Sequence, residues 1–556
     1  LRVYASVQQA FVFSKYKYGN PEVGVDFNGN SPGALLQGID YSTYPVPRTF
    51  TFGLNINFQL LKLNTIMKNH KYMLAMLLSS SLLVGCQGDF LNLPSETSLS
   101  TAVYYKSQSD FEQAINGAYA PLRDLYNGTH GAWAMGEMRS DNTTYKYNPN
   151  DRGTIEAEFV KNFLDDATNG VPRSKYVIDY RIISRVNHLL EPIDAVSFDQ
   201  KIKDNIKGQA YFLRALAYFD LVQYFGSVPI HLKPAKTQAD TSQPLASVED
   251  VYKQIIADAG QAVSLLPSKA DQEPGRATKG AANTLLGNVY IVQKRWAEAE
   301  QVLKEVTGYE LMPRYADVFE LANKNGPESI FEIQFKDGNE GLHSSFFYTF
   351  LVQPITAEET TAITGIPEVA RTIEGYNIPT PDIMEAYEPG DVRKDVSVGF
   401  VTAHGISYPY IKKYCHAHTQ SGKTGDNWPV YRYAEVLLFI AEALNEQGKT
   451  EEALVYLNRV RSRALLPVSS ASTQSDVREA IIKERRVELA FENKRWLDLV
   501  RTGSAEQVMK SYGERVKANP SAYYFPEGFS VAPTAFTDIR ILFPLPASEA
   551  ALSPYF

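Results

Sequence analysis

Cysteine and clusters of basic residues are what this chain lacks most clearly. Its 556 residues include only two cysteines, Cys86 and Cys415. With Cys86 taken up by a lipid, as argued below, Cys415 has no partner in the chain, which excludes a disulfide framework. Lys and Arg number 55 against 63 Asp and Glu, a formal net charge of −8, and no basic stretch stands out beyond the region that follows Met67. Because phosphate binding needs clustered Lys and Arg, the composition argues against a nucleic-acid partner.

Sequence motifs of catalysis and metal binding are missing as well. There is no G-x-S-x-G nucleophile elbow, and SGKT at residues 421–424 is not a P-loop, because Ala417 stands where the first glycine is needed. In CHAH, the spacing of Cys415, His416 and His418 matches no usual metal site and a fourth ligand is missing, so we interpret this stretch as a solvated loop. We therefore predict a protein that is not an enzyme and that needs no metal or cofactor.

A lipoprotein export signal is present, but about eighty residues into the chain. Met67 opens the basic stretch MKNHK, which leads into the apolar run YMLAMLLSSSLLV and then into LVGC, ending at Cys86. The apolar run is too short to span a membrane as an ordinary helix, and LVGC matches a lipobox. We predict that residues 67–85 are a signal peptide and that Cys86 carries the lipid anchor. The next residues, QGDF, resemble the surface-export signal of Bacteroidetes lipoproteins, so we expect a surface-facing lipoprotein of the outer membrane.

Residues 1–66, ahead of this signal, have the pattern of β-strands. In RTFTFGLNINF, residues 48–58, apolar residues alternate with small or polar ones, as in a strand of an outer-membrane barrel. LRVYASVQQAFVF, residues 1–13, is a second candidate strand, and two strands cannot close a barrel. Residues 1–58 resemble the C-terminal tail of a SusC-type TonB-dependent transporter. We favour a gene-boundary artefact, in which the end of one protein joins the start of the next, over a working fusion.

Helical periodicity dominates from about residue 100. Its clearest stretches are residues 109–126, 176–194, 202–226 and 248–267. Residues 285–306, which contain the L-G-x-x-Y core of a tetratricopeptide helix pair, share small and apolar positions with residues 441–460. The matching positions are Ala299, Leu303 and Val306 in the first and Ala453, Leu457 and Val460 in the second. We predict a mostly α fold, a tetratricopeptide-like helical scaffold with a long insertion.

The insertion, residues 311–428, differs in composition from the helical parts at residues 86–310 and 429–556. ESIFEIQF alternates like a strand, and Pro, Gly, Thr and aromatic residues dominate after it. Long irregular segments are usually functional or disordered, and this one is too rich in aromatic residues for disorder. Because loops on a rigid scaffold often carry binding sites, we expect a ligand site in this loop-rich insertion.

Six segments of the body form an ordered set of motifs. They are MRSDNTTY, GQAYFLRALAYFDLVQYFGSVPI, GRATKGAANTLLGNVYI, YRYAEVLLFIAEALNEQGKTEEAL, ERRVELAFENKRWLDLVRTG and LFPLPASEAALSP. Together they resemble the SusD/RagB family of nutrient-binding lipoproteins over most of residues 86–556. The resemblance implies a mostly helical fold with four tetratricopeptide-like units. It also implies a SusC-like barrel as partner and the capture of glycans or, in some members, of peptides.

Glycan binding requires flat rings and planar polar side chains, because sugar C–H faces stack on aromatic rings while Asp, Asn and Arg bond the hydroxyls. The candidate ligand contacts are Trp133, Asp141, Asn142 and Tyr145 in HGAWAMGEMRSDNTTYKY, and Phe347, Tyr348, Arg371 and Tyr376 in the insertion. Core packing, a turn or a helix cap is the alternative for each. Trp296 and Trp496 lie on helical patterns and are expected in the core. Trp428 precedes a helix and is an intermediate candidate, between core residue and ligand platform. The charges of ERRVELAFENKRW are expected to form a buried or interface ion network.

The leading hypothesis for function is a surface-anchored outer-membrane lipoprotein that binds oligosaccharide or polysaccharide and delivers it to a SusC-like TonB-dependent transporter. Two alternatives stay open: peptide binding, as in some RagB-like members, and a structural gating lid with little ligand affinity of its own. A broad aromatic platform would favour glycan. An extended cleft that offers backbone partners would favour peptide.

Overall fold

The computed structural model describes residues 2–8, 49–55, 104–370 and 375–555. They belong to two compact units, residues 1–95 and residues 96–556, and each is described by itself. The helical scaffold and its insertion belong to the second unit. The predicted signal peptide, residues 67–85, and the predicted lipidation site, Cys86, fall outside the described residues.

The described part of the first unit is a single antiparallel strand pair. It consists of β1 (Arg2–Gln8) and β2 (Thr49–Asn55), in a register that places Ala5 opposite Phe52. Both strands lie inside the segments that the sequence pattern singles out. Their origin in a transporter barrel stays a prediction.

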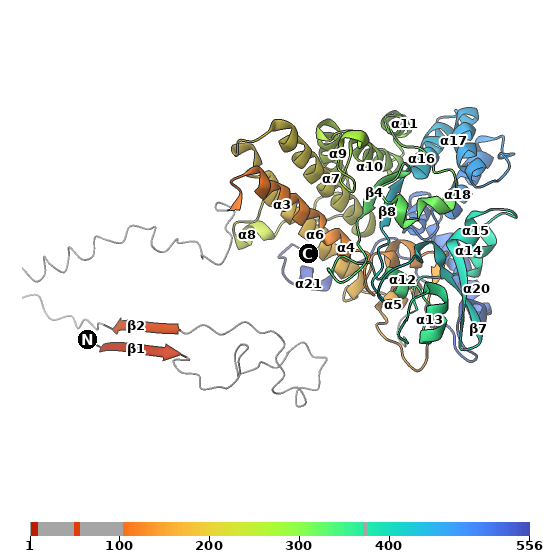
Figure 1. Ribbon diagram of the computed structural model, residues 1–556, viewed down its shortest axis with the longest axis horizontal. Coiled ribbons are helices and arrows are strands. Elements are labelled where there is room, and N and C mark those ends of the chain that lie inside the picture. Colours follow the sequence, from red (N-terminus) through yellow and green to blue (C-terminus); the bar gives the residue numbers. More distant parts are fainter. Residues whose placement is uncertain (1, 9–48, 56–103, 371–374, 556) are drawn as a thin grey trace, which may run out of the picture. The chain divides into compact units, whose positions relative to one another are not determined.

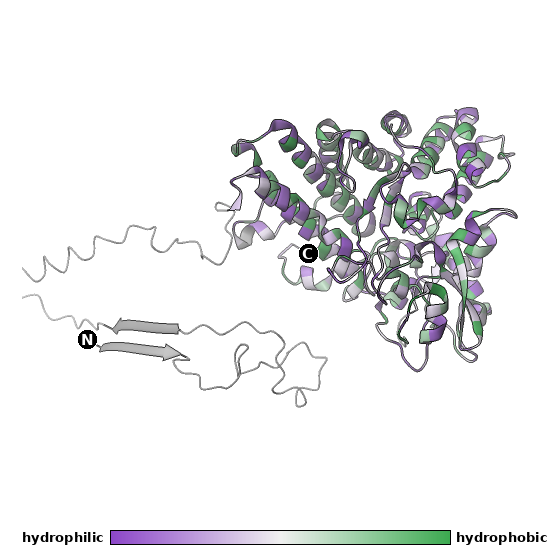
Figure 2. Ribbon diagram, viewed as in Figure 1, coloured by the Kyte–Doolittle hydropathy of each residue, from purple (hydrophilic) through white to green (hydrophobic). Residues whose placement is uncertain are grey.

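The second unit is mostly helical, as its periodicity predicts (Figure 1). The helices that precede the insertion are α3 (Gln108–Tyr119), α4 (Pro121–Asp124), α5 (Glu156–Asn162), α6 (Gly170–Leu190), α7 (Gln200–Phe225), α8 (Gln238–Thr241), α9 (Val248–Leu265), α10 (Lys279–Val292) and α11 (Trp296–Lys304). Hydrophobic and hydrophilic residues are interleaved along these helices (Figure 2), as expected where one face is buried and the other meets water.

Local sequence sets the ends of the longest helices. The Asp199 carboxylate caps α7 by accepting a hydrogen bond from the Ile202 backbone N–H at 3.0 Å. The helix ends at Gly226, whose φ of +74° is a conformation that glycine adopts without steric cost. Ser247 caps α9 in the same manner, and Pro267 follows its end. These caps and breakers lie where the sequence pattern places the helix boundaries.

Helices after the insertion repeat the pairing seen before it. They are α16 (Tyr433–Glu446), α17 (Thr450–Arg463), α18 (Gln474–Glu488), α19 (Arg495–Arg501), α20 (Ala505–Ala518) and α21 (Ala547–Ala550). In the series α7, α9, α10, α11, α16 and α17, each helix packs on the next (Figure 1). The two halves of the scaffold, which lie far apart in the sequence, are therefore neighbours in space.

The two similar helix pairs, α10–α11 and α16–α17, share buried small residues. Ala299 and Ala453 are both fully buried at equivalent positions. A Cβ added at Gly287 in α10 would lie 2.4 Å from the Leu303 side chain of α11, so this glycine lets the two helices approach closely. Ala441 takes the equivalent place in α16 and is also fully buried. The repeated sequence pattern thus corresponds to a repeated packing contact, while its assignment as tetratricopeptide-like stays a prediction.

The insertion combines short helices with small antiparallel sheets. Its elements are β4 (Ser329–Ile333), α12 (Phe346–Thr349), α13 (Ala357–Thr364), β5 (Ile378–Pro379), α14 (Pro381–Ala386), α15 (Arg393–Ser397), β6 (Val398–Ala403) and β7 (Ile406–Ile411). β4, predicted from its alternation, pairs with β8 (Trp428–Arg432) at the start of the second scaffold half. β5 pairs with β3 (Thr143–Thr144) from the first half, and β6 pairs with β7. The insertion is thus attached to both halves of the scaffold by strand pairing.

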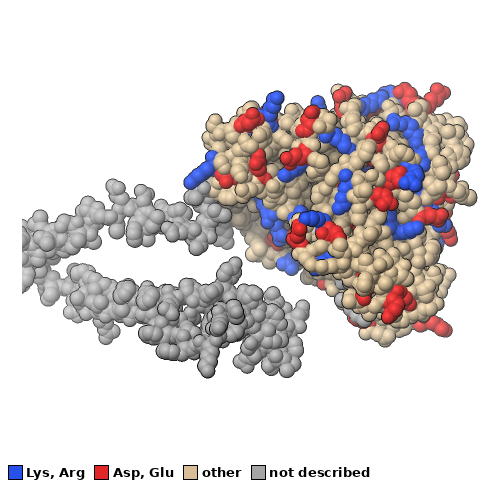
Figure 3. All heavy atoms as spheres, viewed as in Figure 1, with Lys and Arg blue, Asp and Glu red and all other residues tan. Residues whose placement is uncertain are grey.

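The surface of the second unit carries charges of both signs. On the face shown in Figure 3, Lys and Arg alternate with Asp and Glu, and broad uncharged areas lie between them. Within the described part of the chain, no helix has both the length and the apolar character needed to cross a membrane.

Candidate functional site

The sequence-predicted ligand residues lie in the interior of the fold. Seven of the eight are described, and all seven are almost fully buried: Trp133, Asp141, Asn142, Tyr145, Phe347, Tyr348 and Tyr376. Arg371 lies outside the described residues. A side chain without accessible surface cannot stack on a sugar or bond its hydroxyls. The prediction that these seven residues contact the ligand directly is therefore corrected: they hold together the segments around a site.

Trp133 is a core residue. Its ring is 0% exposed and lies 5.3 Å from the ring of Phe350 and 6.0 Å from that of Tyr376, measured between centroids. A Cβ added at Gly131 would lie 2.1 Å from the indole nitrogen. Gly131 therefore makes room for a buried indole, rather than forming part of an exposed loop around a ligand platform. The contact with Tyr376 does join the two segments that the sequence singled out.

Asp141 and Asn142 are structural. Asp141 accepts a hydrogen bond from Arg495 Nε at 2.8 Å and forms an ion pair of the same length with Arg486. Burial alone would raise the pKa of Asp141, but the two guanidinium groups hold it well below its usual range. Asn142 Nδ2 donates to the Glu137 carboxylate at 3.0 Å. These contacts, and not a ligand, occupy the polar atoms of the MRSDNTTY motif.

The remaining predicted residues are held by packing and hydrogen bonds. The hydroxyl of Tyr145 accepts a hydrogen bond from Asn162 Nδ2 at 2.8 Å, and the hydroxyl of Tyr376 donates to the backbone oxygen of Thr154. Phe347 and Tyr348 belong to α12, and their ring centroids lie 5.3 Å apart. None of these rings has a face open to solvent.

The CHAH segment is not the solvated loop that its composition indicates. His418 is 6% exposed, and its Nε2 lies 2.5 Å from the hydroxyl of Tyr348. His416 is paired through Nδ1 with the buried carboxylate of Asp426. Burial raises the pKa of the Cys415 thiol to about 12. Among the described residues no group of three or more His, Cys, Asp and Glu is placed to hold a metal ion.

Of the other three tryptophans, two are fully buried and one is partly buried. Trp496 is buried, as predicted, whereas Trp296 is only partly buried and packs against the edge of the core. Trp428, the intermediate candidate between core residue and ligand platform, is 1% exposed and therefore lies in the core. Its ring stacks between those of Tyr126 and Tyr414, with centroid distances of 4.5 and 5.5 Å. Much of the aromatic content of the chain is thus used to fill the interior around the insertion.

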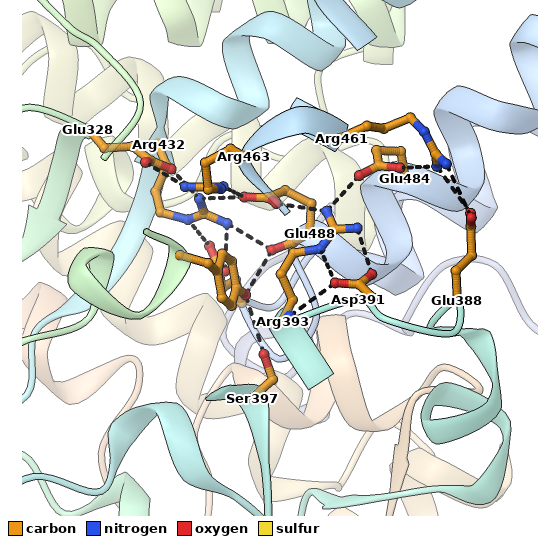
Figure 4. A network of polar contacts seen from close by, with 12 residues as sticks. Glu328, Glu388, Asp391, Arg393, Ser397, Arg432, Arg461, Arg463, Glu484 and Glu488 are labelled. Carbon is orange, nitrogen blue, oxygen red and sulfur yellow. Dashed lines mark hydrogen bonds and ion pairs between the residues drawn. The ribbon is translucent and has the colours of Figure 1, made fainter. Parts of the chain in front are cut away.

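The charges of ERRVELAFENKRW form a buried ion network, as predicted (Figure 4). Glu488 lies at its centre and contacts Arg393, Arg432 and Arg463, which reach it from the insertion, from β8 and from α17. Further ion pairs extend the network to Glu328, Asp391, Glu484, Arg461, Glu388 and Glu492. Because every carboxylate faces at least one guanidinium, the network ties the insertion to the second scaffold half without leaving a lone buried charge.

Aromatic residues do reach the surface, beside the two segments that were predicted to bind the ligand. We call this set the surface aromatic cluster: Tyr147, Tyr408, Tyr524, Phe525 and Phe529. The ring centroid of Tyr147 lies 5.3 Å from that of Phe525 and 5.2 Å from that of Phe529. Tyr408 and Tyr524 pack edge to face at 6.0 Å. Phe525 is buried beneath the others, Phe529 is 40% exposed, and the three tyrosines are partly exposed.

Three distant parts of the chain build this cluster. Tyr147 follows β3, Tyr408 lies in β7 of the insertion, and Tyr524 and Phe529 come from the segment after α20. The Tyr147 backbone N–H donates to the Tyr524 carbonyl at 3.2 Å, which fixes the first and last of these segments together. The hydroxyl of Tyr524 donates to the Pro379 carbonyl in β5 at 2.6 Å, which fixes the insertion as well.

Planar and charged groups surround the rings of the cluster. The Arg152 guanidinium lies 4.1 Å above the Tyr147 ring and pairs with Glu158. Burial raises the pKa of Glu158 to about 7, against the opposing effect of Arg152. Lys146 Nζ donates to the Gln353 carbonyl at 3.1 Å and lies 5.8 Å from the Tyr408 ring. Exposed rings beside the partly exposed Arg152 guanidinium are chemistry suited to recognition of sugars, whereas Glu158 is buried and serves to hold Arg152 in place.

The segments singled out in the sequence lie beside the surface aromatic cluster, but the side chains selected in them are buried. Tyr147 lies two residues after Tyr145, so the alternation of an extended segment places both rings on one side, and the polar stretch NPN that follows is a sign of the surface. Phe529 carries no comparable signal, because its neighbours Pro526 and Gly528 indicate only a turn.

Comparison with known proteins gives two family matches. A model described as "Starch-binding associating with outer membrane" matches residues 89–291, and a model of the SusD family matches residues 397–555. Among curated proteins, SusD-like protein P2 of Formosa agariphila is 29% identical over 534 residues, which cover 87% of this chain and 97% of that protein. A SusD-like protein of Bacteroides ovatus is 26% identical over 465 residues, covering 75% of this chain and 80% of that protein.

Solved structures share the fold. A laminarin-binding SusD-like protein is 25% identical with a TM-score of 0.66, covering 81% of this chain and 98% of that chain. Surface glycan-binding protein A from Bacteroides thetaiotaomicron, in complex with laminarihexaose, is 20% identical with a TM-score of 0.64, covering 80% of this chain and 97% of that chain. The latter likeness concerns the fold alone. The family matches cover residues 89–291 and 397–555, and the curated relatives and solved structures that this chain resembles are SusD-like proteins whose fold it shares.

Proposed function

We propose that this chain is a surface-facing outer-membrane lipoprotein that binds oligosaccharide at the surface aromatic cluster and delivers it to a SusC-like TonB-dependent transporter. The observation that carries the proposal is the partly exposed set of rings, flanked by the partly exposed guanidinium of Arg152, on a SusD-like body. Similarity to a laminarin-binding SusD-like protein supports glycan as the ligand. Capture of this kind needs no reaction, only a fixed face of rings and hydrogen-bonding groups.

Delivery to a transporter rests on the sequence. The segment ahead of the signal resembles a SusC tail, and one family match is described as associating with the outer membrane. The lipid on Cys86 would keep the protein beside such a barrel. Peptide binding and the gating lid are the alternatives, and one titration distinguishes them from glycan capture.

The test is calorimetric titration of the protein with laminarihexaose, other soluble oligosaccharides and a set of oligopeptides. Phe529→Ala removes the most exposed ring of the cluster, and we expect it to weaken glycan binding about tenfold, the loss typical of one stacked ring. Phe400→Ala is the matched control, because Phe400 is 61% exposed on β6 and forms no ring contact within the described residues.

Four results would contradict the proposal. Equal glycan affinity of the parent and Phe529→Ala would show that the cluster is not the binding site. A loss of glycan affinity in Phe400→Ala alone would instead place the site around Phe400 on the β6–β7 hairpin. Saturable binding of peptides instead of glycans would favour the RagB-like alternative. No binding to either class would favour the gating lid.

A further inference from the structure

A cavity lies elsewhere on the same body. It is a cavity of about 300 Å³ between α6, the loop at residues 229–235, the residues around Gln243 and the C-terminal segment at α21. Its lining includes Tyr180, Ile183, Pro229, His231, Gln243 and Leu552, and it shares no residue with the surface aromatic cluster. Its volume is at the lower end of the range found for ligand pockets, which suits one small ring rather than an extended chain.

The floor of the cavity combines apolar faces with polar groups that are already paired. The Tyr180 hydroxyl donates to the Pro229 carbonyl at 2.7 Å. Asn187 donates from Nδ2 to the His231 carbonyl at 2.9 Å, and its Oδ1 accepts from Arg214 at 2.8 Å. The floor therefore offers a ligand the apolar surface of Tyr180 and Pro229, and its own polar groups are already hydrogen-bonded within the protein.

His231 supplies polarity at one side of the cavity. Its backbone atoms are engaged, because its N–H donates to the Tyr218 hydroxyl at 2.7 Å and its carbonyl accepts from Asn187. Its ring packs edge to face on Tyr180 at 5.8 Å, and within the described residues no hydrogen bond involves the ring nitrogens. Burial lowers the pKa of His231, so the neutral imidazole has one donor and one acceptor to offer.

The rim adds neutral hydrogen-bonding groups and balanced charge. Ser184, Ser242 and Gln243 contribute hydroxyl and amide groups, and the charged Lys233 and Glu549 are opposite in sign. An anionic or cationic ligand would need an excess of the opposite charge, which this rim does not have. A ring with an apolar face and hydroxyls around its edge fits both the floor and the rim.

We propose that this cavity is a second carbohydrate site, which binds one pyranose ring of a neutral sugar. The choice of ligand rests on the proposed glycan-binding function, but the site itself is separate from the cluster. One pyranose ring has few contact atoms, so its Kd is on the order of millimolar. A single ring bound here would be either a free monosaccharide or a terminal unit of an oligosaccharide.

Saturation-transfer NMR with D-glucose and D-galactose tests the site, because it detects millimolar binding. Ser184→Trp places an indole in the cavity from an exposed position of α6, and we expect it to abolish transfer to the sugar. His231→Ala keeps the backbone hydrogen bonds and should reduce transfer at least fivefold. Ser264→Trp, at an exposed serine of α9 away from the cavity, is the matched control and should retain it.

The outcomes separate this inference from the proposed function. Absence of transfer to either sugar in the parent protein, or undiminished transfer in Ser184→Trp, overturns the second site. Loss of monosaccharide binding in Phe529→Ala also overturns it, because the ring would then bind at the cluster. If laminarihexaose binding depends on Phe529 while neither monosaccharide binds, the proposed function stands and this inference fails.

Discussion

Removing the charge of Glu488 should be strongly destabilising. Glu488 ends α18 with no exposed surface. One carboxylate oxygen accepts from Arg432 at 3.0 Å and pairs with Arg463, and the other accepts from Arg393 at 2.9 Å. The substitution Glu488→Gln keeps the shape but leaves three buried guanidinium groups with one negative charge fewer, and it turns an amide N–H₂ towards them.

The expected magnitude follows from the pKa of this carboxyl. Burial raises the pKa of Glu488, but Arg463, Arg432 and Arg393 together lower it from the usual 4.5 to about 2. That difference corresponds to about 3 kcal/mol of stability. It agrees with the ~3–5 kcal/mol that breaking a buried ion pair costs in other proteins. Because the folded-state pKa is the lower one, this stability is present above pH 4.5 and is lost as the pH falls from 4.5 through 2.

Urea unfolding followed by tryptophan fluorescence at pH 7 and at pH 3 provides the assay. At pH 7, Glu488→Gln should unfold at a clearly lower urea concentration than the parent, and at pH 3 the difference should shrink. The matched control is Glu506→Gln, which removes the same charge from an exposed pair with Lys510 and should have no measurable effect. An equal response of both variants at pH 7, or a difference that does not change with pH, would refute the network argument.

Further predictions concern packing. Gly287→Ala should lower the stability by about 1–3 kcal/mol in thermal unfolding, because the new methyl group meets the buried Leu303 side chain. In the control Gly260→Ala, in α9, the methyl group meets open space, and the stability should rise by up to about 1 kcal/mol. Trp133→Ala should cost about 3–5 kcal/mol by leaving a cavity. Trp133→Phe, a milder change, should bind laminarihexaose as the parent does, and a selective loss of affinity in this variant would return Trp133 to the ligand site.

Helices and the ion network could be predicted from the sequence because their causes are local or compositional. The period of apolar residues in α7, its Asp199 cap and its terminal Gly226 all lie within one stretch of chain. The charges of ERRVELAFENKRW lie at the end of α18, in the turn after it and at the start of α19, and apolar residues alternate with them, so burial has to pair them. Neither inference requires knowledge of which distant segments meet.

Ligand residues could not be predicted in the same way, because their exposure depends on distant contacts. The glycines around Trp133 look like those of a flexible loop. In the fold, a Cβ at Gly136 would lie 2.4 Å from Asn493 Oδ1, which is more than 350 residues away in the chain. The glycine content therefore reflects close packing, which sequence alone does not distinguish from mobility. The same holds for Tyr145 and Tyr147: both rings pack against Phe525, yet Tyr145 is 2% exposed whereas Tyr147 is partly exposed.

Buried and exposed residues of the candidate site have separable roles. Asp141, held by Arg486 and Arg495, lies four residues before Tyr145, on the same segment that carries Tyr147 to the surface. The charged motif of the second scaffold half therefore positions, through buried ion pairs, the segment that carries Tyr147 of the surface aromatic cluster. A change in Asp141 should alter stability and, through the displaced segment, affinity together, whereas a change in Phe529 should alter affinity alone. Only exposed residues of the cluster can therefore report on ligand contact, since every buried candidate confounds contact with folding.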